Sequence, residues 1–282
     1  MRASFLLAVF VCAVPAVHAA TDCDRECLRS FITQYLAALV AHNPGALPVA
    51  DKVKFTEDSV QVPLGEGLWK TASRPHGYRQ DILDVRAGVA ASQVVMDAGD
   101  SPVLLVLRLK VVGRKITEIE TMVTHTQKEG ALFKPDAIQP KAMNAAPDPS
   151  QLPSREDAIK LAEFYPAGLK VGSFVTVNAP FAPDAYRVEN GVNTAGPGCS
   201  RAGCENLKTQ TIMKHPDITH RVVAVDEELG IVLLRMNFGN TGSYGPGNAL
   251  IVWEAFKVYG GQIHAVEAFM KVMPATTGSG WE

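Results

Sequence analysis

Two ionisable side chains in the second half of the chain stand in apolar surroundings and could carry acid–base chemistry. Glu254 lies between Val252 and Phe256 on one face of a predicted strand, and an apolar setting raises the pKa of a carboxyl group. Such a group can act as a general acid or base. Arg187 could pair with Glu254 or hold a phenolate or carboxylate. A buried structural ion pair and a solvent-facing strand edge are the alternatives, and both stay open.

A second polar group lies in the first half, within residues 75–81. This segment is unusually polar for one that enters a sheet. His76, Tyr78 and Arg79 form a reasonable set for proton transfer and for holding an anion, so we take them as further catalytic candidates. The alternative is an exposed loop followed by an edge strand.

Three more residues are candidates for substrate binding. Trp69 and Trp253 could stack on an aromatic substrate, although large aromatic side chains more often belong to a core. Asn190 completes this set. Glu120 and Glu267 recur at matching positions in the two halves of the chain, which favours a shared structural role, either hairpin hydrogen bonding or an ion pair.

The sequence contains no metal-binding motif, phosphate loop, dinucleotide fingerprint or nucleophile elbow. We therefore expect no cofactor and no metal. Chemistry by side chains alone restricts an enzyme to acid–base reactions such as elimination, isomerisation, retro-aldol cleavage or cyclisation. The formal net charge is -2 and no basic run occurs, so we expect no nucleic-acid partner.

The N-terminus has the pattern of an export signal. Arg2 precedes an apolar run over residues 5–14, and residues 17–19 form a small-x-small processing site. We predict a signal peptide over residues 1–19 and a mature chain that begins near Ala20. No later stretch is long and apolar enough to span a bilayer, so the expected location is the periplasm or the medium, with no membrane partner.

Four cysteines remain after the signal peptide, an even number in an oxidising compartment. The simplest pairing is local, Cys23 with Cys27 and Cys199 with Cys204. Zinc is the rival interpretation, but no histidine lies at finger-like spacing from either pair.

The two halves of the chain are internally similar. Residues 107–121 and 253–268 each have the alternating apolar pattern of a β-hairpin around a glycine-containing turn. In the register that aligns these hairpins, Glu254 replaces Leu107. A core residue in one half and an ionisable one in the other is hard to explain by packing.

A second match aligns residues 54–60 with 186–192 and places Arg187 on Phe55. An amphipathic helix is predicted upstream of each match, over residues 26–41 and 155–171. The apolar positions predicted for the second helix are Ala158, Leu161, Phe164 and Leu169.

This order of elements predicts an α+β fold with two tandem domains, residues 20–132 and 154–282. Residues 133–153 are rich in proline and alanine without a sustained period, so we predict a linker there.

The order of a helix, a short strand and long paired strands resembles the nuclear-transport-factor-2 (NTF2) fold. The chain is also similar to a family of secreted double-domain SnoaL-like proteins, mostly uncharacterised. The similar segments are VKFTED at 53–58, PLGEGLW at 63–69, ITEIE at 116–120, RVEN at 187–190 and SGW at 279–281.

The resemblance implies two cone-shaped domains, each with a curved sheet and helices that enclose an apolar pocket. It extends to the cofactor-independent diarylpropane lyases of sphingomonads, which release formaldehyde from lignin-derived dimers. It therefore implies a lyase for a small aromatic substrate. The alternatives are a periplasmic protein that binds small hydrophobic molecules and a SnoaL-like isomerase or cyclase. Cones of this type bury their outer sheet face against another cone, within one chain or in a homo-oligomer.

Overall fold

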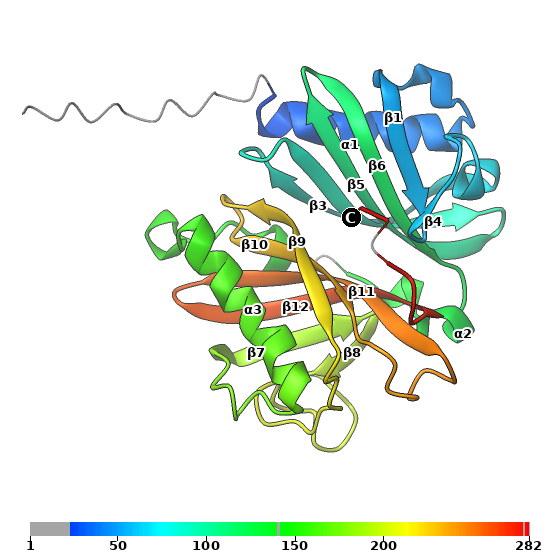
Figure 1. Cartoon of the computed structure of the whole chain (residues 1–282). Coiled ribbons are helices and arrows are strands. Elements are labelled where there is room, and N and C mark those ends of the chain that lie inside the picture. Colours follow the sequence, from blue (N-terminus) through cyan, green and yellow to red (C-terminus); the bar gives the residue numbers. More distant parts are fainter. Residues whose placement is uncertain (1–22, 140–141, 279, 282) are drawn as a thin grey trace, which may run out of the picture.

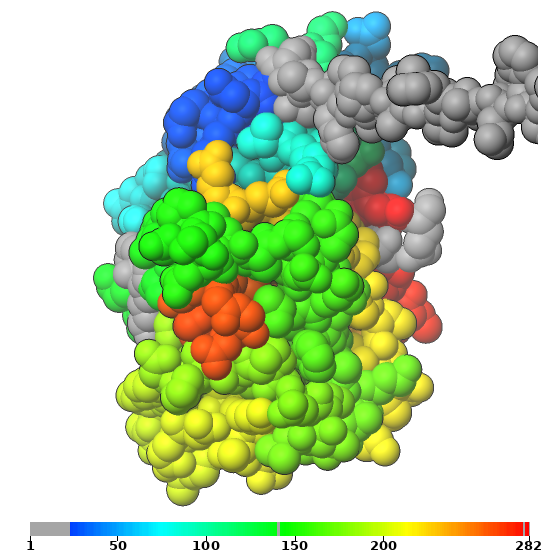
Figure 2. Space-filling view, turned by 90° about the vertical axis from the view of Figure 1, so that its left-hand side faces the viewer, coloured from blue at the N-terminus to red at the C-terminus, as the bar shows by residue number. Residues whose placement is uncertain are grey.

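The computed structural model describes residues 23–139, 142–278 and 280–281. The predicted signal peptide over residues 1–19 lies outside the described residues. The chain forms two similar domains that lie one above the other (Figures 1 and 2).

The first domain begins with helix α1 (Arg25–Val40) and continues into a six-stranded sheet. The strand order is β2-β1-β6-β5-β4-β3, and every neighbouring pair is antiparallel except β1 and β6. The strands are β1 (Val49–Glu57), β2 (Val60–Gln61), β3 (Ala72–Asp84), β4 (Val89–Ala98), β5 (Ser101–Val112) and β6 (Lys115–Thr124).

The second domain repeats this arrangement with helix α3 (Arg155–Val171) and the strand order β8-β7-β12-β11-β10-β9. Only β7 and β12 pair in parallel. The strands are β7 (Phe181–Glu189), β8 (Val192–Ala195), β9 (Thr219–Asp226), β10 (Ile231–Asn237), β11 (Asn248–Tyr259) and β12 (Gln262–Pro274). The fold is α+β and consists of two tandem NTF2-like domains.

Short helical turns connect these elements, and the segment between the domains contains four of the six described ones. They are η1 (Pro44–Ala46), η2 (Gly67–Lys70), α2 (Gln127–Gly130), η3 (Pro135–Ala137), η4 (Ala142–Asn144) and η5 (Pro149–Gln151). Several begin at a proline, whose fixed φ suits the first position of a helical turn.

The register of the internal repeat is the one that the sequence predicts. Phe55 pairs with Ile119 in the first sheet, and Arg187 pairs with Val266 at the equivalent place in the second. Leu107 likewise lies opposite Thr121. Its counterpart Glu254 lies opposite Ala268.

Each long helix starts at a side-chain cap. The Asp24 carboxylate accepts a hydrogen bond from the Cys27 backbone, and the Ser154 hydroxyl accepts one from Asp157. The predicted inward position of Phe164 was wrong, because Phe164 is exposed and its neighbour Tyr165 is buried. The buried stripe runs through Ala158, Ala162, Tyr165 and Leu169, a helical spacing that leaves residue 164 at its side.

The two sheets pack against each other through their outer faces, and the helices cover the inner faces. One apolar cluster fills the space between α1 and the first sheet, and a second lies between α3 and the second sheet. A third cluster joins the outer faces of both sheets, with residues such as Ile82 and Val106 against Leu233 and Trp253. The face that such cones bury against a partner is therefore covered within one chain.

Reciprocal ion pairs fix the two domains to each other. Arg25, at the start of α1, donates to the buried carboxylate of Asp226 at 2.6 and 2.8 Å. Arg155, at the start of α3, donates to the buried Asp84 carboxylate at 2.9 and 2.6 Å. Each carboxylate also accepts a backbone hydrogen bond from the other domain, so the contact follows the pseudo-twofold symmetry of the repeat.

Two disulfides, Cys23–Cys27 and Cys199–Cys204, confirm the predicted local pairing. Such bonds fit a protein that matures in an oxidising compartment. None of the helices in the described part of the chain is long and apolar enough to cross a membrane.

Candidate functional site

The interior of the first cone is filled by apolar side chains. Phe55 and Leu107 are almost fully buried between α1 and the sheet. Trp69 is 1 % exposed and packs edge-on against Tyr35, with ring centroids 5.3 Å apart. Trp69 is therefore a core residue in this structure, which gives it no open face for an aromatic ligand.

The interior of the second cone carries charge at the same two positions. Glu254 points from β11 to the face shared by Val252 and Phe256, which pack in the cluster under α3. Arg187 lies on β7 and is 7 % exposed. The structure thus brings the two predicted residues into one buried site, at places that Leu107 and Phe55 occupy in the other domain.

Arg187 is held by a set of hydrogen bonds and one ion pair. Its Nη1 donates to the Tyr165 hydroxyl of α3 at 2.9 Å, and its Nε donates to Thr194 Oγ1 at 2.8 Å. Its Nη2 lies 3.4 Å from Gln210 Oε1, and Nε lies 3.3 Å from a carboxylate oxygen of Glu189. The buried cation therefore has a carboxylate partner other than Glu254.

Glu254 is 1 % exposed, and neither of its carboxyl oxygens has a hydrogen-bond partner in good geometry among the described residues. Burial is the main cause that raises its pKa, to about 8, and the charge of Glu189 acts in the same direction. Arg187 and the nearby Tyr165 hydroxyl oppose this shift. Burial without a dedicated counter-ion therefore favours the protonated, neutral form of Glu254.

His215 and Tyr244 lie beside this cluster and had no role in the sequence interpretation. The charges of Glu189 and Arg187 shift the pKa of the Tyr244 hydroxyl, so this group lies near both. The Tyr244 ring stacks with the imidazole of His215, with ring centroids 6.1 Å apart. Burial lowers the pKa of His215, so the imidazole is neutral at pH 7. Its Nδ1 has no hydrogen-bond partner in the described structure.

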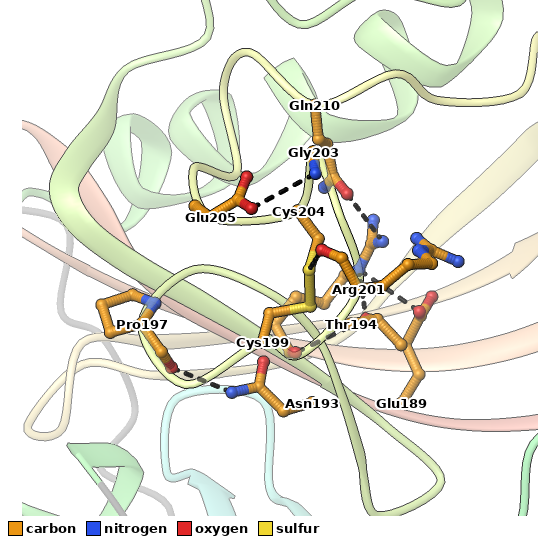
Figure 3. Close-up of a disulfide and its surroundings, with 11 residues drawn as sticks. Glu189, Asn193, Thr194, Pro197, Cys199, Arg201, Gly203, Cys204, Glu205 and Gln210 are labelled. Atoms are coloured by element: carbon orange, nitrogen blue, oxygen red, sulfur yellow. Dashed lines mark hydrogen bonds and ion pairs between the residues drawn. A yellow bond between two sulfur atoms is a disulfide. The ribbon is translucent and has the colours of Figure 1, made fainter.

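The Cys199–Cys204 disulfide closes the loop that follows β8, next to the arginine site. Figure 3 shows Glu189, Thr194 and Gln210 beside this disulfide. The loop is further fixed by a hydrogen bond from the Gly196 backbone to the Cys204 carbonyl. A covalent bridge at this place limits the positions available to the segment that carries Gln210.

The predicted catalytic group of the first half is not assembled in the structure. His76 lies between two carboxylates, with Nδ1 2.7 Å from Asp97 and Nε2 2.7 Å from Asp136 of the linker. Arg79 points to the other side of β3, where its Nε donates to Asp81 at 2.8 Å. His76 and Tyr78 line one pocket, which the linker also borders, and Tyr78 and Arg79 line another beside α1.

Tyr78, the third member of that group, belongs to the domain contact. Its hydroxyl donates to Glu267 at 2.9 Å, and the Tyr186 hydroxyl donates to the other oxygen of the same carboxylate at 2.9 Å. The matching residue Glu120 lies against Arg221 of the second domain. The expected shared role of the two glutamates is therefore a role in joining the domains.

The remaining substrate-binding candidates, Trp253 and Asn190, make structural contacts. Trp253 is 1 % exposed and lies on the outer sheet face, in the cluster between the domains. Asn190 is fully buried, and its amide nitrogen donates to the carbonyls of Leu132 at 2.9 Å and Met270 at 3.0 Å. Trp253 thus belongs to the domain contact, and Asn190 joins the segment after α2 to β12.

The arrangement in the second cone suits proton transfer without a cofactor. It combines a protonated carboxylic acid, a fixed guanidinium and a second, more exposed carboxylate. Carboxyl groups in different environments are the usual basis for separate acid and base roles. No group of three or more histidine, cysteine or acidic side chains within the described ranges is arranged to hold a metal ion.

Comparisons with known proteins give a family model and a distant structural likeness. Residues 151–270 match a family model described as a domain of unknown function, DUF8021. No curated protein matches the chain. The crystal structure of a putative ketosteroid isomerase from Kribbella flavida aligns with 49% of this chain and 96% of its own, at 14% identity and a TM-score of 0.30.

Proposed function

We propose that the chain is a cofactor-independent acid–base enzyme whose site is the interior of the second cone. The observation that carries this proposal is the buried carboxyl of Glu254, whose pKa burial raises to about 8, at a position where the first cone has Leu107. Burial of a polar carboxyl group costs stability. A protein retains such a group where it serves a ligand or a reaction.

The proposed substrate is a small aromatic molecule that carries hydroxyl groups, and a lignin-derived diarylpropane is the specific candidate. A base removes the proton of the primary alcohol, the neighbouring carbon–carbon bond breaks, and formaldehyde leaves. The released electron pair forms the alkene and expels the benzylic hydroxyl, which Glu254 protonates to water. Glu189 is the candidate base, and Arg187 offsets phenolate charge.

This assignment is tested by incubating the purified protein with phenolic diarylpropanes and assaying formaldehyde. The Glu254→Gln variant should lose about 10²- to 10⁴-fold in turnover, the range typical of a positioned proton donor. Glu156→Gln is the matched control, because Glu156 is an exposed carboxylate on α3. Absence of formaldehyde across the substrate panel removes the lyase proposal.

A binding protein for small hydrophobic molecules is the second candidate. It is favoured by the apolar side chains that surround the site between α3 and the second sheet. A bound ligand selective for the folded state raises the melting temperature by mass action. Stabilisation by phenolic ligands without any product would favour this function, whereas product formation would exclude it as the only role.

We also propose that the protein is exported to the periplasm or the medium, a location supported by its two disulfides. Mass spectrometry of periplasmic material should find a chain that begins near Ala20 and lacks four thiol hydrogens. Its full-length cytoplasmic form is the reference. A chain that keeps its first 19 residues in the mature fraction contradicts export by cleavage.

A further inference from the structure

The connection between β10 and β11 differs strongly from its counterpart in the first domain. There, only Gly99 and Asp100 join β4 to β5, whereas residues 238–247 lie between β10 and β11. The flanking strands pair in the same antiparallel way in both domains. The longer loop is therefore an addition to the second domain, which is also the domain with a charged cone interior.

This loop is tied to the rest of the protein mainly by its ends. Gly239 and Gly247 lie where it leaves and rejoins the sheet, with φ angles of 74° and 73° that an L side chain rarely adopts. Over residues 240–246, the hydrogen bonds in the described structure stay within the loop or join its own end, for example from the Ser243 backbone to Thr241. A segment with so few external hydrogen bonds opens at a low cost in free energy.

Tyr244 is the side chain from the middle of the loop that enters the second cone. It packs against the apolar cluster under α3. Its ring stacks on the buried imidazole of His215, with centroids 6.1 Å apart and an angle of 11° between the planes. Burial and the charge of Glu189 raise the pKa of its hydroxyl to about 12, and Arg187 opposes the shift. Tyr244 is thus a neutral phenol near both charged groups.

The two proposed catalytic side chains are closed to solvent. Glu254 is 1 % exposed and Arg187 is 7 % exposed, so a ligand reaches them only after some segment moves aside. The loop that carries Tyr244 combines few external hydrogen bonds with a side chain near Arg187. It is therefore the candidate for that movement.

We propose that the space filled by the Tyr244 side chain is a subsite for a phenol ring of the ligand, and that Tyr244 leaves it when the loop opens. This inference rests on the proposed function, in which the ligand is phenolic. A place that holds one phenol has the shape and polarity to hold another, and the ligand takes it over by selecting the open loop. A bound phenol then faces Glu189, the candidate base, and Arg187, the candidate partner of a phenolate.

Removing the tyrosine ring tests this proposal on the full mature chain. The probe is 4-methylphenol, because it is the tyrosine side chain without its backbone. Tyr244→Ala empties the subsite, and a cavity left by a lost ring can bind a ligand of that shape. Calorimetric titration should show binding of 4-methylphenol to Tyr244→Ala at least about tenfold tighter than to the native chain, where the tyrosine competes for the same place. Toluene should bind the variant about tenfold more weakly, because it lacks the hydroxyl that meets charged groups.

Tyr259→Ala is the matched control. Tyr259 also stacks on a histidine, His264, with ring centroids 3.5 Å apart, but it lies at the turn between β11 and β12. This variant should bind 4-methylphenol no better than the native chain does. Tyr244→Leu is the second variant in case Tyr244→Ala is unstable. It should show an affinity between those of Tyr244→Ala and the native chain, because leucine fills part of the space.

The proposal is overturned if folded Tyr244→Ala or Tyr244→Leu binds 4-methylphenol no better than the native chain. Equal binding to Tyr259→Ala, or toluene binding as tight as that of 4-methylphenol, also overturns it. The formaldehyde assay separates this subsite from the reaction. If Tyr244→Ala gains affinity for 4-methylphenol while no diarylpropane yields formaldehyde, the phenol subsite stands and only the lyase proposal fails.

Discussion

At the scale of single residues, two substitutions between the repeats distinguish the second cone from the first. Leu107 and Phe55 close the first interior with apolar packing, whereas Glu254 and Arg187 place a carboxylic acid and a cation in the second. Because Glu189 pairs with the arginine at 3.3 Å, Glu254 is free to stay protonated. This difference in charge state is what makes the site suited to acid catalysis.

The stability of the protein should depend on pH through Glu254. Its carboxyl has a pKa near 4.5 in the unfolded chain and about 8 in the folded one. Its contribution is fully present below pH 4.5 and is lost as the pH rises to about 8, because only the unfolded form ionises over that window. Denaturant unfolding of the native chain and Glu254→Gln at pH 5 and pH 8 should show that the variant loses less stability over this window. Parallel pH profiles would contradict the shift.

Much of this site could be predicted from the sequence, but its surroundings could not. Glu254 and Arg187 stood out because the repeat supplies an internal reference for each position. Tyr165 was missed because the helix period alone assigned its neighbour Phe164 to the core. Gln210 comes from an irregular loop, where no periodic pattern indicates which side chains turn inward.

At the scale of elements, the sequence predicted helices and strand register correctly where several local signals agree. The predicted helix over residues 155–171 is α3, and both hairpins have the register of the repeat. His76, Tyr78 and Arg79 show the opposite case. Their common polarity suggested a group, but each side chain contacts a different carboxylate, His76 that of Asp97, Tyr78 that of Glu267 and Arg79 that of Asp81.

The Cys199–Cys204 disulfide should stabilise the loop beside the arginine site. Replacing both cysteines by serine should cost about 2 kcal/mol, the chain-entropy value for so short a loop. Ligand affinity at the second cone should fall as well, because Gln210 lies next to the bridge. Thermal unfolding and ligand titration measure the two effects. The Cys23–Cys27 double variant is the control, and an equal loss of affinity there would contradict a local effect.

At the scale of the whole molecule, the tandem arrangement provides within one chain the contact that single cones obtain by dimerisation. The reciprocal pairs Arg25–Asp226 and Arg155–Asp84 lie at the edges of an apolar interface. The sequence alone left open whether that contact is internal or between chains, since local patterns do not report how two outer sheet faces meet.

Removing one partner of these pairs should destabilise the whole chain. Asp84→Ala leaves the Arg155 guanidinium without its main acceptor and should cost about 3–5 kcal/mol. The double variant with Arg155→Ala should recover part of this loss, and a double-mutant cycle measured by denaturant unfolding gives the coupling. Strictly additive losses would show that the pair does not hold the domains together.

Replacing the two charged residues of the second cone by their apolar counterparts from the first cone should separate the effect on stability from the effect on function. The double variant Arg187→Phe, Glu254→Leu restores the residue types of the other cone, and replacing buried charges by apolar groups is often neutral or stabilising by about 1–4 kcal/mol. We expect a folded protein with an unchanged or higher melting temperature and no ligand binding or turnover in the second cone. Retained turnover would place the chemistry elsewhere.

The protonation state of Glu254 is the central claim, and its direct measurement is a carbon-13 NMR titration of glutamate side-chain carboxyl groups. Comparison of the native chain with Glu254→Gln assigns the resonance. The structure predicts that this resonance titrates near pH 8, because burial and Glu189 outweigh Arg187. A midpoint near 4.5 would show an ionised carboxylate paired with Arg187 and would contradict an acid–base site in the second cone.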